Sequence, residues 1–245
     1  MTFPVLISIG GWRVHPHVFF EALAYAAAAA TFLWLRRRRG DSLSGTNRLS
    51  LVAAVFVGAL IGGRLLAWFD NPEAQARGVI GVMDGKTLVG ALVGGWIATE
   101  VEKRRMGIRQ PTGDLYVYPL IAGIAIGRIG CFLSGLPDGT YGTATSLPWG
   151  IDFGDGIARH PTAIYESLFV IGLGLALIPI WRRATVGYTF KLFTTSYLAF
   201  RLVVDTIKPG VALVLGLTAI QWACVFGLLY YAQWYVRLKP DTTRA

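Results

Sequence analysis

Long apolar stretches constrain the fold of this chain more than any other feature. A helix needs about 20 apolar residues to cross roughly 30 Å of hydrocarbon, and stretches of that length recur along the whole sequence. They lie at residues 17–35, 49–69, 79–99, 115–135, 162–181, 187–207 and 211–235. Asp84 and Lys86 interrupt the third stretch, whose uninterrupted part begins at Thr87. The pattern predicts an all-α polytopic membrane protein, a bundle of seven transmembrane helices.

The composition excludes other classes of protein. Hydrophobic residues make up 54% of the 245 residues and charged residues only 15%, a balance that an ordinary soluble domain does not have. Two cysteines are too few for a disulfide scaffold. The sequence shows no sustained repeat and no soluble segment that would divide it. We therefore expect one integral membrane domain over residues 1–245, located in a bacterial plasma (inner) membrane.

Basic residues concentrate in alternate connections between the spans. They are Arg36, Arg37, Arg38, Arg39, Arg48, Lys103, Arg104, Arg105, Arg109, Arg182, Arg183, Arg237, Lys239 and Arg244. The opposite connections hold only Arg13, Arg77, Lys86, Arg159 and Lys208. Because basic loops stay in the cytoplasm, we expect the amino terminus outside and the carboxyl terminus in the cytoplasm. Short basic clusters at helix ends, with no soluble domain to carry them, are not typical of a nucleic-acid partner.

Ionisable side chains within or at the edges of the expected spans mark a candidate site, because a charge in the membrane is costly. They are Glu21, Arg64, Arg128, Glu166, Lys191, Arg201 and Asp205. Six share the depth of the outer leaflet, whereas Lys191 lies near the cytoplasmic end, where a long side chain reaches the interface. We expect the six to line one polar cavity in which the three arginines bind the phosphate of an anionic lipid.

A structural alternative exists for the same charges. Arg201 and Asp205 are four residues apart and share a helix face, so they can pair with each other. Glu21 or Glu166 would then neutralise Arg64, and the set would hold helices together without binding a ligand.

The sequence GRIGCFLSG at 127–135 places Arg128 and Cys131 on one helix face, beside Gly127 and Gly130. Cys131 has two interpretations, a nucleophile whose pKa Arg128 lowers or a small thiol that fills a helix interface. Cys224 is interpreted as a packing residue. Glycine pairs four residues apart predict close helix packing, and they are Gly58/Gly62, Gly90/Gly94 and Gly123/Gly127.

The longest polar connection, residues 136–160, is expected on the outer side and leads into His160, Tyr165 and Glu166. We expect these side chains to border the opening of the cavity, although His160 can also be a residue that only shapes the helix start. The three histidines are dispersed, and neither CxxC spacing nor a phosphate-binding loop is present. We therefore expect no metal site and no cofactor.

Five segments together resemble the bacterial prolipoprotein diacylglyceryl transferase family. They are GRIGCFLSG (127–135), DGTYG (138–142), LPWGIDF (147–153), RHPTAIYES (159–167) and RLVVDTIKP (201–209). The resemblance implies an enzyme that moves the diacylglyceryl group of phosphatidylglycerol to the thiol of the lipobox cysteine in a prolipoprotein signal peptide, releasing glycerol phosphate. It also implies that Arg128 binds the phospholipid, with Arg201 as its partner.

Four positions depart from the pattern of that family. Cys131 stands where the family has asparagine, and Asp205 where it usually has glutamate. The family's histidine followed by two glycines appears as Val89-Gly90-Ala91, and its tyrosine in the first span falls at Glu21. With that histidine missing, the candidates for the base that takes the thiol proton are Glu166, His160 and Glu21, while Asp205 orients Arg201.

Two other functions fit parts of the same pattern. One is a related membrane enzyme that transfers from an anionic phospholipid to a different acceptor. The other is an anion or lipid transporter that uses the arginine cavity, which the sequence favours less because it shows no inverted repeat and no paired broken helices.

Overall fold

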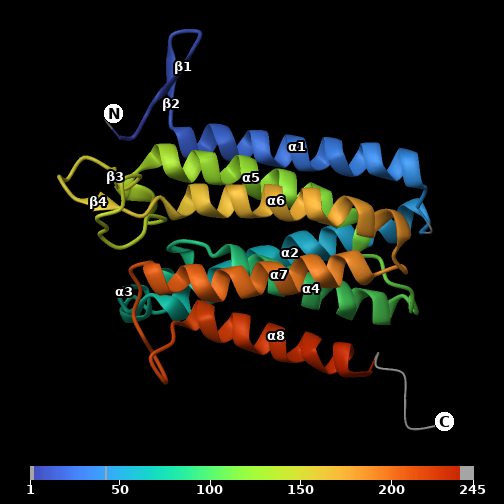
Figure 1. Cartoon of the computed structure of the whole chain (residues 1–245). Coiled ribbons are helices and arrows are strands. Elements are labelled where there is room, and N and C mark those ends of the chain that lie inside the picture. Colours follow the sequence, from blue (N-terminus) through green and yellow to red (C-terminus); the bar gives the residue numbers. More distant parts are fainter. Residues whose placement is uncertain (1–2, 42, 238–245) are drawn as a thin grey trace. The chain divides into compact units, whose positions relative to one another are not determined.

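The computed structural model describes residues 3–41 and 43–237, which are mainly helical (Figure 1). The expectation of an all-α polytopic chain is confirmed at this level. The chain divides into two compact units. The first contains the residues up to 41, 111–193 and 206–209, and the second contains 42–110, 194–205 and the residues from 210 onward.

The first unit is built on α1 (Pro16–Arg39), α5 (Val117–Ser134) and α6 (Thr162–Arg183). α5 packs against both α1 and α6. α1 begins where its sequence favours a start, because Pro16 occupies the first turn and the His15 side chain accepts a hydrogen bond from the backbone N–H of His17. This start fixes the position of His17 at one end of the helix.

Short elements surround one end of these helices. The antiparallel strands β1 (Ile7–Ile9) and β2 (Trp12–Val14) precede α1, and Ile7 lies opposite Val14. The connection from α5 to α6 contains the 3₁₀ helix η3 (Leu136–Asp138) and the strands β3 (Ile151–Asp152) and β4 (Ala158–Arg159). At the other end of α5, η2 (Asp114–Tyr116) leads into the helix.

The second unit contains α2 (Gly45–Asp70), α4 (Leu88–Arg105) and α8 (Ala219–Arg237). α2 and α4 pack against each other, and α8 packs against both. The short α3 (Pro72–Ala76) and η1 (Ile80–Met83) connect α2 to α4. α7 (Tyr188–Val204) begins in the first unit and continues in the second from residue 194, followed by η4 (Asp205–Ile207).

The predicted glycine pairs make the closest helix contact in the second unit. A Cβ added to Gly58 would lie 2.4 Å from the carbonyl oxygen of Gly94, and one added to Gly62 would lie 2.4 Å from that of Gly90. No real Cβ atom tolerates such a distance, so α2 and α4 can approach this closely only through glycine. The prediction of close packing at these two pairs is confirmed.

Two helices begin later than the apolar stretches that contain them. The third stretch becomes helical at Leu88 instead of residue 79, because Gly85 has a positive φ of 76° and Thr87 caps the helix by accepting a hydrogen bond from Gly90 N. The seventh becomes helical at Ala219 instead of residue 211. The residues before it form a turn, with a bridge between Val214 and Leu217.

Four helical segments in the described part of the chain are long and apolar enough to cross a membrane: Pro16–Arg39, Gly45–Asp70, Asp114–Ser134 and Thr162–Arg183. Large apolar side chains such as Phe56 and Leu168 are exposed on them, as expected for surfaces that face lipid. The protein is therefore a multi-pass membrane protein. Lys239 and Arg244, which complete the expected carboxyl-terminal basic cluster, lie outside the described residues.

Candidate functional site

Arg128 and Glu166 form a two-point ion pair between α5 and α6. Arg128 Nε lies 3.0 Å from Glu166 Oε2, and Nη2 donates to Oε1 at 3.1 Å. Both side chains are largely buried, with 11% of Arg128 and 2% of Glu166 exposed. Directly after Glu166, the Ser167 hydroxyl donates to the Ala125 carbonyl at 2.9 Å and fixes α6 against α5. The guanidinium plane is therefore held in one orientation.

The remaining edge of the Arg128 guanidinium faces Cys131. Nη1 lies 3.8 Å from Cys131 Sγ, which confirms that the two residues share a helix face. Since each oxygen of Glu166 contacts a nitrogen of Arg128, this carboxylate neutralises Arg128, not Arg64 as the structural alternative proposed.

Arg201 and Asp205 form a buried pair in the second unit, as the structural alternative predicted. Arg201 Nη2 donates to Asp205 Oδ1 at 2.9 Å, and only 4% and 5% of the two side chains are exposed. The Thr218 hydroxyl donates to the second oxygen, Oδ2, at 2.9 Å. Asp205 is thus held by α7 on one side and by the start of α8 on the other, which suits a residue that orients Arg201.

Arg64 is also in the second unit, where its Nη1 donates to the carbonyl oxygen of Met83 at 2.6 Å. This bond attaches α2 to η1. Because Arg128 belongs to one unit and Arg64 and Arg201 to the other, the convergence of all three on one cavity stays a prediction.

His160 and Tyr165 belong to a polar chain at the start of α6. His160 Nδ1 lies 3.2 Å from the Tyr165 hydroxyl, which accepts a hydrogen bond from Trp149 Nε1 at 2.8 Å. The backbone of His160 pairs with Gly142 and Thr143. These bonds tie the outer loop to the helix, so they agree with the structural interpretation of His160.

The tip of the outer loop is shaped by its own acidic residues. Asp152 Oδ1 accepts backbone N–H groups from Gly154, Asp155 and Gly156. Arg159 Nη1 lies 2.6 Å from Asp155 Oδ1, and this hydrogen bond lowers the pKa of Asp155 below its ordinary value. The loop therefore keeps its charge pairing at neutral pH.

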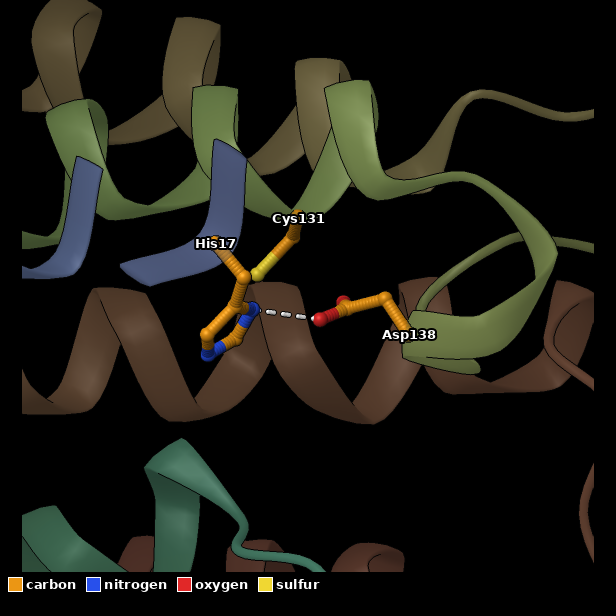
Figure 2. A group of neighbouring side chains, drawn as sticks. All are labelled: His17, Cys131 and Asp138. Atoms are coloured by element: carbon orange, nitrogen blue, oxygen red, sulfur yellow. Dashed lines mark ion pairs between the residues drawn. The ribbon is translucent and has the colours of Figure 1, made fainter. Parts of the chain in front are cut away.

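A third group of side chains gathers at the same end of α5 as Arg128. His17 comes from the first turn of α1, Cys131 from α5 and Asp138 from η3, and Figure 2 shows them side by side. His17 Nδ1 lies 2.6 Å from Asp138 Oδ1. The donor atoms of the three residues all lie within 4.8 Å of one another. Neither His17 nor Asp138 is among the site residues predicted from the sequence.

Glu21 is a neighbour of this group. Its Oε2 lies 3.5 Å from His17 Nε2, and its Oε1 accepts a hydrogen bond from the Tyr25 hydroxyl at 3.1 Å. Because Glu21 is four residues after His17, both lie on one face of α1. Glu21 thus contacts the imidazole on the side opposite Asp138.

Comparison with known proteins decides the family. The model of the family described as prolipoprotein diacylglyceryl transferase matches residues 4–237. The chain belongs to this family. Proteins named phosphatidylglycerol–prolipoprotein diacylglyceryl transferase are 31% identical in Nitratidesulfovibrio vulgaris (strain DP4), over 89% of this chain and 86% of the relative, and 31% identical in Methylobacillus flagellatus, over 89% and 90%. The protein of that name in Clostridium tetani is 28% identical over 84% and 85%.

Because the chain belongs to the prolipoprotein diacylglyceryl transferase family, the cluster around Cys131 is of functional interest. The sequence indicates this cluster only indirectly. His17 shares the expected depth of Glu21, and Asp138 follows the helix that carries Arg128 by only a few residues. A search for ligands at short spacing along the chain misses such a set, because its members meet only after α1 has packed against α5.

Proposed function

We propose that the protein transfers the diacylglyceryl group of phosphatidylglycerol to the thiol of the lipobox cysteine in prolipoproteins and releases glycerol phosphate. The names of its relatives support this activity. The observation that carries it is the Arg128 guanidinium, which a buried glutamate holds by two contacts beside a thiol. Such a guanidinium is preorganised to bind a phosphate and to stabilise its departure.

The proposed arrangement is a single membrane domain over residues 1–245 with seven spans in the plasma membrane of a bacterium. The amino terminus is outside and the carboxyl terminus in the cytoplasm. Four apolar helices and the distribution of basic residues support this topology. It places Arg128 and the loop 136–160 on the side where membrane-anchored precursors of secreted proteins present their lipobox cysteine.

The chemistry requires a cation at the phosphate and a route for the thiol proton. As the sulfur forms its bond to the terminal glyceryl carbon, the bond from that carbon to the phosphate oxygen breaks, and its electron pair stays on the phosphate. Arg128 compensates this charge, assisted by Arg201 and Arg64. Asp205 orients Arg201, and Tyr165 with His160 shapes the entrance beside α6.

Glu166 fits a positioning role better than the role of base. Both of its oxygens contact Arg128, and a carboxylate stabilised by a guanidinium is a weaker base than one without such a partner. Glu21 and His160 remain the proposed bases from the original three. Glu21 has the more suitable surroundings, because it contacts His17 next to Cys131.

The test is an assay with purified protein, phosphatidylglycerol and a lipobox peptide, following glycerol phosphate and the mass of the peptide. Arg128→Lys should lower kcat/KM by about 100-fold or more, the size of effect seen when one preorganised donor to a developing charge is lost. The matched control is Arg37→Lys. Arg37 is an exposed arginine in the last turn of α1, at the end of that helix away from His17.

Each other outcome of the assay points to a different function. Release of glycerol phosphate without modification of the peptide indicates transfer to another acceptor. Absence of both products from folded protein contradicts the enzyme and favours a transporter. Equal activity of Arg128→Lys and Arg37→Lys removes Arg128 from the proposed site.

A further inference from the structure

We infer that His17, Cys131 and Asp138 form a divalent-metal site of the zinc type, whose open fourth position binds the thiol of the acceptor protein. The role in binding the acceptor rests on the proposed function, whereas the metal site itself does not. Nitrogen, thiolate and carboxylate ligands are the three kinds that zinc takes in proteins. Three protein ligands with one open position are the arrangement of catalytic zinc sites.

The distances between the donor atoms suit one ion. Tetrahedral zinc with bonds of about 2.0 to 2.3 Å holds its ligand atoms roughly 3.3 to 3.8 Å apart. In the cluster all separations are within 4.8 Å, and His17 Nδ1 lies 2.6 Å from Asp138 Oδ1. Side-chain shifts of about 1 Å or less therefore bring the three atoms to bonding positions around an ion.

The imidazole nitrogen of His17 that faces the cluster is suited to bind a metal ion. His17 Nδ1 is buried and lies 2.6 Å from Asp138 Oδ1, yet no hydrogen bond satisfies it within residues 3–41 and 43–237. A metal ion beside Nδ1 would contact the nitrogen, the carboxylate oxygen and the nearby sulfur together, because these atoms all lie within 4.8 Å of one another.

The partners of the ligands are those expected around a metal. A histidine ligand usually donates its other ring N–H to a carboxylate, and a carboxylate ligand is itself hydrogen-bonded. On the far side of the ring, His17 Nε2 lies 3.5 Å from Glu21 Oε2. The Thr140 hydroxyl donates to Asp138 Oδ2 at 2.5 Å, which leaves Oδ1 facing the cluster.

The backbone brings the three ligands together through glycine. A Cβ on Gly130 would lie 2.6 Å from Phe20 Cβ and 3.2 Å from the Pro16 carbonyl oxygen, so this glycine admits the first turns of α1 to the surface of α5. His17 and Cys131 each follow one of these contact residues directly. Gly135, which has a positive φ, then turns the chain so that Asp138 returns toward His17, and Gly139 ends η3 directly after Asp138.

The site lies where the proposed reaction needs a thiolate. A thiol that coordinates zinc loses its proton outright, and here the proton passes to water. The bound sulfur would then attack the terminal glyceryl carbon, while the carbon–oxygen bond breaks with its electron pair toward the phosphate at Arg128. Arg128 Nη1 is 3.8 Å from Cys131 Sγ, so phosphate and metal would occupy adjacent positions. With the ion bound, the thiol would need no base in place of the family histidine, and Glu21 would act as a partner of the ligand His17 instead of as the base.

Metal binding is tested without any assay of turnover. Purified protein in detergent, treated with a chelator and then exposed to Zn²⁺ alone, should bind about one equivalent, and Co²⁺ should give a charge-transfer band from sulfur to the metal. Cys131→Ser should abolish the band and Asp138→Asn should weaken binding of both ions. Glu21→Gln should lower the affinity by about 10- to 100-fold, the usual effect of losing a partner of a ligand.

Cys224→Ser is the matched control, because Cys224 is a buried thiol in the second unit. The band should survive this change. Failure to bind Zn²⁺, or binding that is equal in wild type, Cys131→Ser and Asp138→Asn, overturns the site. Thermal unfolding of the metal-free variants shows whether a variant that binds no metal is still folded.

The role of the open position has its own readout. A lipobox peptide added to the Co²⁺ protein without phospholipid should strengthen the charge-transfer band, because a second sulfur binds, whereas the same peptide with serine in place of cysteine should not. Equal spectra with both peptides overturn the thiol role. A protein that passes these spectroscopic tests but transfers no lipid contradicts the proposed function alone. Full transfer activity in the chelated protein overturns the role of the metal.

Discussion

At the scale of single residues, the candidate charges of each unit are neutralised in pairs. Arg128 holds Glu166, and Arg201 holds Asp205, each pair largely removed from solvent. Pairing reduces the cost of keeping a charge at membrane depth. It also fixes the guanidinium plane, so that the edge of Arg128 opposite Glu166 is presented in one direction. A pair that first looks structural is therefore compatible with a phosphate site.

The positioning role of Glu166 predicts non-additive effects of mutation. Glu166→Gln removes the charge and one acceptor of the two-point contact, so we expect kcat/KM for phosphatidylglycerol to fall by about tenfold or more. In the Arg128→Lys background the same change should have little further effect, because lysine has no planar guanidinium for Glu166 to orient. Kinetics of the four proteins in one double-mutant cycle measure this. Additive losses would mean that Glu166 acts independently of Arg128, for example as the base.

The residues of the site differ in how far sequence could predict them. Depth in the apolar segments was enough to predict four site residues, because a charge within a membrane is costly and marks a functional or structural role. These residues are Arg128, Arg201, Glu166 and Asp205. Their exact pairing does not follow, because Arg128 has several carboxylates within the same depth and only packing of α5 against α6 selects Glu166. The contact of His17 with Asp138 depends on α1 packing against α5 and on a turn after α5, and neither leaves a short-range pattern.

At the scale of helices, contacts through glycine set the geometry in both units. In the first unit Gly130 admits α1 to α5, and in the second the pairs Gly58/Gly62 and Gly90/Gly94 face each other. Spacing in the sequence correctly indicated close packing at Gly58/Gly62 and Gly90/Gly94, but a Cβ at Gly123 or Gly127 would make only ordinary contacts, at 3.6 and 3.8 Å, and Gly130 belongs to no predicted pair. Spacing could not indicate which helix each one meets, because every span offers small residues. Helix starts were also uncertain, since the turn at Gly85 and the bend before Ala219 interrupt apolar segments that look continuous.

The α1–α5 contact predicts that Gly130→Ala is disruptive. Its new methyl group would lie 2.6 Å from Phe20 Cβ, so α1 must shift and carry His17 away from Cys131. We expect a loss of about 1 to 3 kcal/mol in the free energy of unfolding from overpacking. Zn²⁺ affinity should fall with it. Gly123→Ala on the same helix is the control, because its methyl group would meet Ala28 Cβ at an ordinary 3.6 Å.

Denaturant titration in detergent and competition for Zn²⁺ with a chelator give the two quantities for Gly130→Ala and Gly123→Ala. If both alanine variants have wild-type stability, the closeness of α1 and α5 at Gly130 is wrong. If Gly130→Ala is destabilised but keeps its Zn²⁺ affinity, His17 does not depend on this contact.

The α2–α4 contact predicts a similar loss in the free energy of unfolding, without a change in Zn²⁺ affinity. Gly62→Ala would place a methyl group 2.4 Å from the Gly90 carbonyl oxygen, a backbone atom that cannot rotate away. We expect destabilisation of about 2 kcal/mol or more, measured by denaturant titration. Gly172→Ala in α6, whose methyl group would meet no atom within 4 Å, should be neutral or slightly stabilising because alanine favours the helix. Equal stability of the two variants would contradict the close packing.

At the scale of the whole molecule, the lengths of the apolar stretches and the distribution of basic residues predict seven spans. The helices alone do not confirm that number. Each of the seven expected stretches contains a helix, yet in the part of the chain that the structure describes only four segments are long and apolar enough to span by themselves. α4 ends in a charged segment that includes Glu100 and Glu102, and α7 has only 17 residues. Such helices cross a membrane when their polar ends reach the interface or other helices cover them. The number of spans therefore depends on the bilayer as well as on the chain.

The topology predicts which loops a membrane-impermeant thiol reagent reaches in intact cells. In a background of Cys131→Ser and Cys224→Ser, Ser146→Cys in the outer loop should be labelled, whereas Arg109→Cys should be labelled only after the cells are permeabilised. Both native residues are exposed, so a difference in labelling reports the side of the membrane and not burial. Three spans separate the amino terminus from Arg109 and one more precedes Ser146, which makes the pair sensitive to whether α4 crosses. Labelling of Arg109→Cys in intact cells would mean that α4 does not span, and Ser146→Cys would then be labelled only after the cells are permeabilised.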